Sequence, residues 1–301
     1  MSIFQDIRTA FDRRDNALNQ LLLLNVLVFA VLIVLHAVLT ISSAGAYYLP
    51  VLRQFEMSSS LPVLARHPWT VLTYAFTHEG FFHILFNLLN LYWFGQLIRE
   101  YLGNRRLVSL YVLGALAGAA VFLLSYNFLP AFRPGLGTPV VGASAAVTAI
   151  IVAGATLLPD YTFMLILLGP VKIKWIALAV VLISLAGING GNPGGEITHL
   201  GGALLGFVFV KQLKAGRDMG RPVQAIGDWV TNLFHRRPTM RVSTTRRPEP
   251  VVTAPRGVRP APVPGQPHPD EVDTILEKIS RSGYESLSKE EKQKLFRASQ
   301  Q

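Results

Sequence analysis

Six long apolar segments constrain this chain more than any other feature of its sequence. A helix needs about 20 mostly apolar residues to cross the hydrocarbon core of a bilayer. Only 15% of the 301 residues are charged, whereas a typical soluble domain carries about 25%. We therefore predict an all-α membrane protein with six transmembrane helices. The segments are residues 20–41, 78–98, 107–129, 139–158, 171–187 and 198–213.

Basic residues in the short loops predict the orientation of these spans. With the N-terminus inside, the inner segments before the tail carry eight Lys and Arg residues and the outer loops carry three. Cytoplasmic loops carry the excess of positive charge in membrane proteins. This pattern predicts a multi-pass protein with both termini in the cytoplasm, and we expect it in a bacterial plasma membrane.

Charge and proline content divide the rest of the chain. Residues 1–19 form a cytoplasmic N-terminal segment, and residues 20–214 form the six-span domain. Residues 215–269 are rich in Pro and Arg, which predicts an extended, disordered linker whose charge attracts anionic lipid rather than nucleic acid. Residues 270–301 regain helical spacing and a capping box at Ser288, so we expect a small helical hairpin with an unidentified partner.

The second span opens with His78, His83 and Asn87. The sequence His-Glu invites comparison with the HExxH zinc motif, which needs its histidines four residues apart on one helix face. His78 and His83 are five residues apart, roughly 140° around a helix, and the sequence offers no third ligand. We expect no metal and no cofactor. His83 and Asn87, by contrast, share a face, and both side chains can donate hydrogen bonds.

Two further polar residues lie at the same predicted depth. Ser144 opens the fourth span after Gly142, and His199 opens the sixth span just before Gly202. A serine in a membrane helix often bonds back to a carbonyl, and a single histidine can be purely structural. However, spans two, four and six all enter from the outer side, so a hydroxyl, an imidazole and two donors meet at one level. Acyl transfer needs this set: a nucleophile, a general base and oxyanion donors.

The ordered set His78-x4-His83-x3-Asn87, Gly-Ala-Ser144 and His199-Leu-Gly-Gly in alternate spans resembles the rhomboid family of intramembrane serine proteases. The resemblance covers residues 20–213. It implies a six-helix rhomboid-like bundle with a Ser–His dyad and no metal. Carried onto this sequence, it makes Ser144 the nucleophile and His199 the general base, with oxyanion donors from His83, Asn87 and the Ser144 backbone N–H. His78, Gly142 and Gly202 would support the site.

The sequence departs from the family pattern near the serine. Ala145 replaces the glycine that usually follows the serine, which we expect to be tolerated if residue 145 is helical. Thr148 stands where the family often has an aromatic residue that stacks under the histidine, so the support of His199 is in question. In the first outer loop, Trp69 is followed by Thr70 instead of the arginine common in the family.

Two loops complete the sequence-based hypothesis. Residues 187–195 contain five glycines and are interpreted either as a plain connector or as a mobile lid above the site. Residues 162–169 are apolar but too short to span, so they are interpreted as a re-entrant or interfacial stretch.

The resemblance implies a hydrolase, a serine-type endopeptidase that cleaves single-span membrane proteins near the outer face of the membrane. A non-proteolytic rhomboid-like binding or quality-control protein is one alternative. A transporter or channel is the second alternative, although the sequence shows no repeated halves of the kind that transporters carry.

Overall fold

The computed structural model describes residues 16–165, 169–234 and 269–298. The chain divides into two compact units, Met1–Arg237 and Pro238–Gln301, which are described separately.

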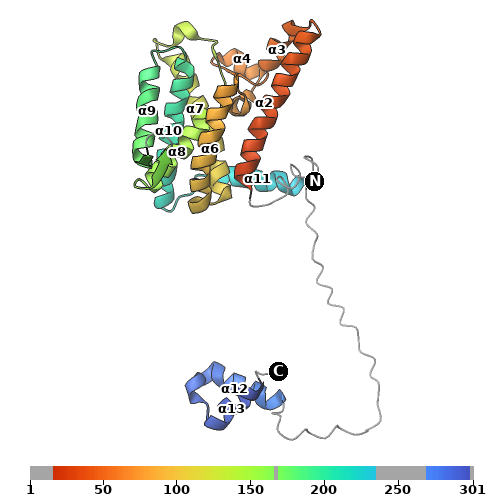
Figure 1. Cartoon of the computed structure of the whole chain (residues 1–301), viewed down its shortest axis with the longest axis vertical. Coiled ribbons are helices and arrows are strands. Elements are labelled where there is room, and N and C mark those ends of the chain that lie inside the picture. Colours follow the sequence, from red (N-terminus) through yellow and green to blue (C-terminus); the bar gives the residue numbers. More distant parts are fainter. Residues whose placement is uncertain (1–15, 166–168, 235–268, 299–301) are drawn as a thin grey trace, which may run out of the picture. The chain divides into compact units, whose positions relative to one another are not determined.

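The first unit is a helical bundle (Figure 1). Its long helices overlap the six apolar segments of the sequence. Three of them, α2, α6 and α7, are long and apolar enough to cross a membrane by length and composition. Helices α8 and α9 are apolar but shorter, and α10 has 22 residues, so the number of spans stays a prediction. The six helices are α2 (Ala17–Ile41), α6 (Phe81–Leu102), α7 (Asn104–Phe128), α8 (Ser144–Leu157), α9 (Ile173–Gly187) and α10 (Pro193–Lys214).

Helix α8 is the centre of this bundle and contacts α6, α7, α9 and α10. Nine of its residues are buried, most of them alanine or β-branched. Glycines of the neighbouring helices allow the close approach. A Cβ added to Gly118 of α7 would lie 2.6 Å from the Ala145 Cβ, and one added to Gly202 of α10 would collide with the Ala145 carbonyl oxygen. Small residues at helix interfaces are the expected means of packing in a membrane.

The segment between α2 and α6 is irregular and rests on the bundle. It contains η1 (Gly45–Tyr47), α3 (Tyr48–Leu52), β1 (Met57–Ser58), α4 (Leu61–Arg66), α5 (Thr70–Thr73) and η2 (Tyr74–Phe76). Strand β1 pairs antiparallel with β2 (Pro139–Val140), which follows η3 (Arg133–Gly135). The buried Tyr74 hydroxyl donates to the Ala115 carbonyl at 2.7 Å. These contacts fix the chain just before α6 and just before α8.

The structure adds detail to two sequence-based interpretations. In the stretch interpreted as re-entrant or interfacial, β3 (Thr162–Leu165) and β4 (Gly169–Lys172) pair as an antiparallel hairpin, with Lys172 and Lys174 both bound to Asp160, and its position in the membrane stays a prediction. The expected linker 215–269 is not extended throughout, because Arg221–Phe234 form helix α11, which contacts α7. The remainder of that linker, residues 235–268, lies outside the described residues, as do residues 1–15.

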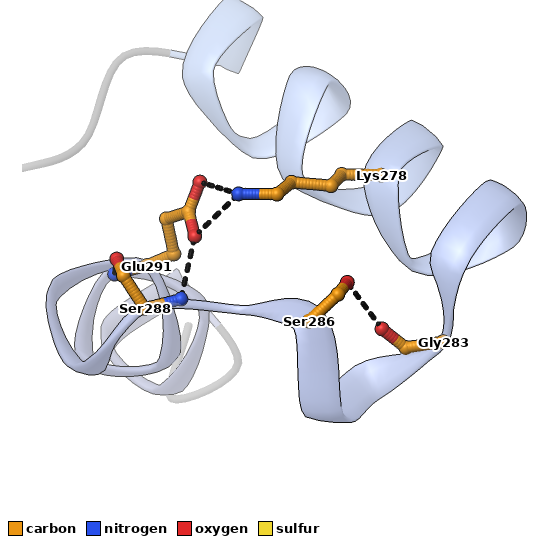
Figure 2. Close-up of polar contacts among 5 residues, drawn as sticks. All are labelled: Lys278, Gly283, Ser286, Ser288 and Glu291. Carbon is orange, nitrogen blue, oxygen red and sulfur yellow. Dashed lines mark hydrogen bonds and ion pairs between the residues drawn. The ribbon is translucent and has the colours of Figure 1, made fainter.

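The second unit contains α12 (Pro269–Ser282), η4 (Tyr284–Ser286) and α13 (Lys289–Ala298). Figure 2 shows the polar contacts that join the two helices, with Lys278 of α12 bound to both carboxylate oxygens of Glu291 at 2.8 and 3.0 Å. The Ser288 N–H donates to Glu291, and the Glu291 N–H donates to the Ser288 hydroxyl, which together make a capping box at the start of α13.

Candidate active site

Ser144 is the first residue of α8, where the chain turns sharply into the helix. Gly142 has a φ of +122°, which a residue with a side chain rarely adopts, and its N–H donates to the Tyr74 carbonyl at 2.9 Å. The first N–H groups of a helix have no partner within the helix. The Ser144 N–H is therefore available to a bound group beside the Ser144 hydroxyl.

His83 and Asn87 lie on the first two turns of α6 and face the same cavity as Ser144. Asn87 is buried, with 7% of its surface exposed, and its side-chain amide donates to the His83 carbonyl at 2.9 Å. That bond uses one of the two amide hydrogens, so a second donor remains. A Cβ added to Gly142 would lie 2.7 Å from His83 Nε2 and 3.6 Å from Ser144 Oγ, which places the imidazole beside the serine.

His78 precedes α6 and is not part of the cavity wall. The Ala143 N–H donates to His78 Nε2 at 3.4 Å, and the His78 ring meets the His83 ring edge-on at 5.0 Å between centroids. His78 thus contacts both the turn before Ser144 and the side chain of His83.

His199 lies on the second turn of α10, and its Nδ1 has two neighbours. Ser184 Oγ of α9 is 3.0 Å away, and Glu196 Oε2 of the same helix is 3.2 Å away. Neither neighbour was identified from the sequence. The spacing of Glu196 and His199 at i and i+3 was a usable signal, since such residues are neighbours on a helix surface. The contact with Ser184 had no such signal.

A cavity of about 420 Å³ brings these side chains together. His83, Asn87, Ser144 and His199 all line it, along with Glu196 and Ser184. No hydrogen bond joins Ser144 to His199 in the part of the chain that the structure describes. Catalytic hydrogen bonds are often long before substrate binds, so the roles of these residues stay predictions. The other lining residues are largely apolar and come from α6, α8 and α9: Phe82, Phe86, Asn90, Val147, Thr148, Ile151, Val180 and Ile183.

The structure shows the surroundings of the residues that depart from the family pattern. Ala145 is buried and helical, which is the condition under which we expected an alanine to be tolerated there. Thr148 lines the cavity, and among the described aromatic contacts none involves His199. Trp69 donates from Nε1 to the Gln54 carbonyl at 2.8 Å. Above the site, residues 187–195 contain a tight turn at Gly187 and the N-cap of α10, where Asn192 accepts from the Gly195 N–H at 3.0 Å.

Within the described residues, no three His, Cys, Asp or Glu side chains gather closely enough to hold a metal ion. The set that lines the cavity instead combines a hydroxyl, imidazoles, an amide and a backbone N–H, which are the groups of acyl-transfer chemistry.

Comparison with known proteins identifies two regions. Residues 65–214 match the rhomboid domain, and residues 267–301 match a family of unknown function (DUF6576). RHOMBOID-like protein 12, mitochondrial, of Arabidopsis thaliana is 32% identical over 158 residues, which cover 49% of this chain and 47% of that protein. Rhomboid-like protein 16, chloroplastic, of the same plant is 30% identical over 49% of this chain and 50% of that protein. Rhomboid protein 1, mitochondrial, of Saccharomyces cerevisiae is 31% identical over 52% and 45%.

This chain spans about half the length of the curated relatives it matches. Their names correct one prediction. We expected a bacterial plasma membrane, whereas these relatives are named as mitochondrial or chloroplastic, and the comparison therefore contradicts that expectation. Loop charge reports which side of a membrane a segment faces, and it carries no information about which membrane that is.

Proposed function

The chain belongs to the rhomboid family, and on that premise we propose that it is an intramembrane serine endopeptidase with Ser144 as nucleophile and His199 as general base. The observation that carries this proposal is the cavity that Ser144, His199, His83 and Asn87 line together at the N-terminal ends of α6, α8 and α10.

The reaction follows from the chemistry of these groups. Ser144 Oγ attacks the scissile carbonyl carbon while its proton passes to His199 Nε2, and the C–O bond forms as the carbonyl becomes an oxyanion. The Ser144 N–H, His83 and the free amide hydrogen of Asn87 donate to that oxyanion. His199 then gives its proton to the leaving amine, and water releases the acyl group by the same two steps. The helix dipoles of α6, α8 and α10 favour negative charge at this end of the bundle.

The substrates we propose are single-span membrane proteins. A transmembrane helix satisfies its own backbone groups and so hides its carbonyls from a nucleophile. A substrate must therefore unwind locally, and helix-breaking residues near the cleavage site would favour it. The apolar walls of the cavity, from Phe86 of α6 and Val180 and Ile183 of α9, suit an apolar peptide segment.

Purified protein incubated with a single-span reporter substrate tests this proposal. Wild type should cleave the reporter and react with a fluorophosphonate probe, whereas Ser144→Ala and His199→Ala should do neither. The double variant should be no worse than either single one, because the two residues act as a unit. Substantial cleavage by purified Ser144→Ala would refute the mechanism. A folded wild type that binds the reporter without cleaving it would favour the non-proteolytic alternative.

A second part of the proposal concerns the basic segment after α11. Residues 235–259 carry seven Arg residues and one acidic residue, and basic residues near a surface of anionic lipid each contribute about 1 kcal/mol of attraction, which salt weakens. Truncation after Arg237 should leave cleavage in detergent unchanged. In vesicles, it should weaken the salt-sensitive preference of the full chain for anionic lipid, because five of these seven Arg residues are lost. Loss of activity in detergent would instead assign the C-terminal part a role in catalysis.

A further inference from the structure

Helix α11 leaves an apolar stripe uncovered. Ile226, Trp229 and Leu233 are 62%, 62% and 61% exposed, and Val230 is also exposed. These four residues follow the spacing i, i+3, i+4, i+7, which places them on one face of the helix. Asp228 and Asn232 lie on the other side. A soluble helix normally buries such a face, so the stripe needs a partner.

The opposite face of α11 is fixed to the end of a membrane span. Asp228 pairs with Arg105 through two bonds of 3.1 and 3.3 Å. Just before the helix, Asp218 accepts from Arg106 Nε at 3.0 Å, and the Gly220 carbonyl accepts from the Ser109 hydroxyl at 3.3 Å. Arg105, Arg106 and Ser109 all belong to the first two turns of α7.

The length of α7 then sets the depth of α11. Its 25 residues extend about 37 Å at 1.5 Å per residue, which exceeds the hydrocarbon thickness of about 30 Å. The excess length leaves at least one end of α7 outside the hydrocarbon, and because the first turn carries Arg105 and Arg106, we place that turn among the lipid headgroups with α11 beside it. In Figure 1, α11 runs across the end of the bundle instead of along it.

The charges around α11 match this depth. The last turns of α6 and α10 carry Arg99, Lys211 and Lys214, and Arg217 and Arg221 follow before and at the start of α11. Cations at headgroup level and an apolar stripe that contains a tryptophan are typical of helices that lie in the membrane interface.

We propose that α11 is an interfacial anchor, with Ile226, Trp229, Val230 and Leu233 inserted at the boundary between phospholipid headgroups and acyl chains. The partner is the bilayer that surrounds the bundle. This inference is independent of proteolysis, because it rests on the exposed stripe and on the ion pairs that hold the helix at the end of α7.

The chain has no cysteine, so single-cysteine variants need no altered background. Leu233→Cys and Asn232→Cys place a nitroxide on adjacent residues, one in the stripe and one outside it. In full-length protein in phosphatidylcholine vesicles, the label at position 233 should be relaxed mainly by oxygen, which concentrates in lipid. The label at position 232 should be relaxed mainly by a water-soluble nickel complex.

Equal access of the nickel complex to both labels would overturn the proposal, because the stripe would then face water. A label at position 233 that neither agent reaches would also overturn it, because protein would then cover the stripe. Trp229 fluorescence, taken as the difference between wild type and Trp229→Phe because the chain has four tryptophans, gives a second measurement. Brominated lipid should quench this difference signal more strongly when the bromine lies near the headgroup than when it lies at the chain end.

A second inference concerns the support of His199, and it rests on the proposed proteolytic function. A carboxylate can only accept hydrogen bonds. With Glu196 Oε2 at 3.2 Å from Nδ1, the imidazole is favoured in the form that carries its proton on Nδ1. That form leaves the Nε2 lone pair free to take the proton of Ser144.

The surroundings hold Glu196 in this position. A Cβ added to Gly187 would lie 2.9 Å from the Glu196 carboxyl carbon, so the glycine at the end of α9 provides the space that the carboxylate occupies. Ser184, one turn earlier on α9, reaches the same Nδ1 at 3.0 Å. Thr148 stands where an aromatic residue often supports the histidine, and no described aromatic ring contacts His199.

We infer that Glu196 is a positioning residue for His199 and that Ser184 assists it. Glu196 then orients the imidazole of the proposed dyad, which a stacked aromatic ring often does in the family. Glu196→Gln replaces an obligatory acceptor with a group that can donate to Nδ1 and stabilise the wrong form of the ring. The expected result is a kcat about 10²-fold lower with KM nearly unchanged, at the lower end of the range for loss of general acid–base function.

Glu196→Asp keeps the carboxylate and should recover much of the lost kcat, which a merely structural role would not require. Glu100→Gln, at the far end of α6, is the control for loss of a carboxylate and should behave as wild type. Wild-type kcat in Glu196→Gln would overturn the inference, and so would an equal loss in Glu196→Asp. Failure of wild type to cleave, or cleavage by Ser144→Ala, would refute the proposed function itself and is a distinct result.

Discussion

Gly142→Ala is the substitution that most directly probes the geometry around the proposed oxyanion site. Gly142 has a φ of +122°, and an added Cβ would lie 2.7 Å from His83 Nε2 and 2.9 Å from His83 Cε1. The backbone strain alone costs about 1–3 kcal/mol. The contact is too short for any Cβ, so either the His83 ring or the turn before Ser144 has to move.

Movement of either group misaligns one donor to the oxyanion. Loss of one such donor lowers kcat by about 10²–10³, or roughly 2.7–4 kcal/mol of transition-state stabilisation. We therefore expect Gly142→Ala to fold with reduced thermal stability and to cleave a single-span reporter about 10²–10³ times more slowly. Where the His83 ring is the group that moves, the losses should not add in the Gly142→Ala and His83→Ala double variant, because the same donor is then already displaced.

Gly137→Ala is the matched control. Gly137 lies in the same segment before α8, with a φ of +99°, but an added Cβ there would meet nothing within 4 Å. It should lose comparable thermal stability and keep its kcat. The reasoning is refuted if Gly142→Ala cleaves at the wild-type rate, or if Gly137→Ala loses as much activity as Gly142→Ala.

Three further predictions follow from other contacts. Asn87→Ala should lower kcat by about 10²–10³; unchanged turnover with lower thermal stability would make Asn87 a packing residue only. Gly202→Ala should destabilise the bundle by about 1–3 kcal/mol in thermal or denaturant unfolding, because its Cβ would meet the Ala145 carbonyl, whereas Gly227→Ala, with open space around it, should not. Lys278 and the Ser288 N–H lower the pKa of Glu291 to about 2. The stabilisation that these two contacts give the second unit is therefore present above the ordinary Glu pKa and is lost as pH falls toward 2. Carboxylate NMR should show this titration of Glu291, and Lys278→Ala should move its pKa back toward the ordinary value.

Much of the candidate site could be predicted because membrane depth is a strong constraint on sequence. The position of a polar residue along a membrane-spanning segment determines its depth in the membrane, and alternate spans enter from the same side. Polar residues near the start of alternate spans therefore lie at the same depth. Ser144, His83, Asn87 and His199 could therefore be grouped without knowledge of any contact, and the structure gives all four a common cavity. Their chemical roles do not follow from this placement and stay predictions.

The contacts that depend on helix rotation could not be predicted in this way. Ser184 reaches His199 only because α9 turns that face toward α10, and an apolar helix such as α9 shows little periodicity from which to derive its rotation. Helix α11 was missed for a different reason. The spacing of Ile226, Trp229, Val230 and Leu233 was present in the sequence, but the surrounding Pro and Arg residues made the whole stretch resemble a linker.

The replacement of glycine by Ala145 is best understood from the helices on either side. The Ala145 Cβ fits against Gly118 of α7, while its carbonyl approaches Gly202 of α10. Gly118 thus makes room for the methyl group of Ala145, while Gly202 lets α10 approach the backbone of α8. Because Ala145 directly follows Ser144 and Gly202 comes three residues after His199, the contact between Gly202 and the Ala145 carbonyl sets the serine and the histidine at one level of the bundle. A larger residue at position 145 would press against Gly118 of α7 and would therefore disturb the site through the backbone, without touching either side chain of the proposed dyad.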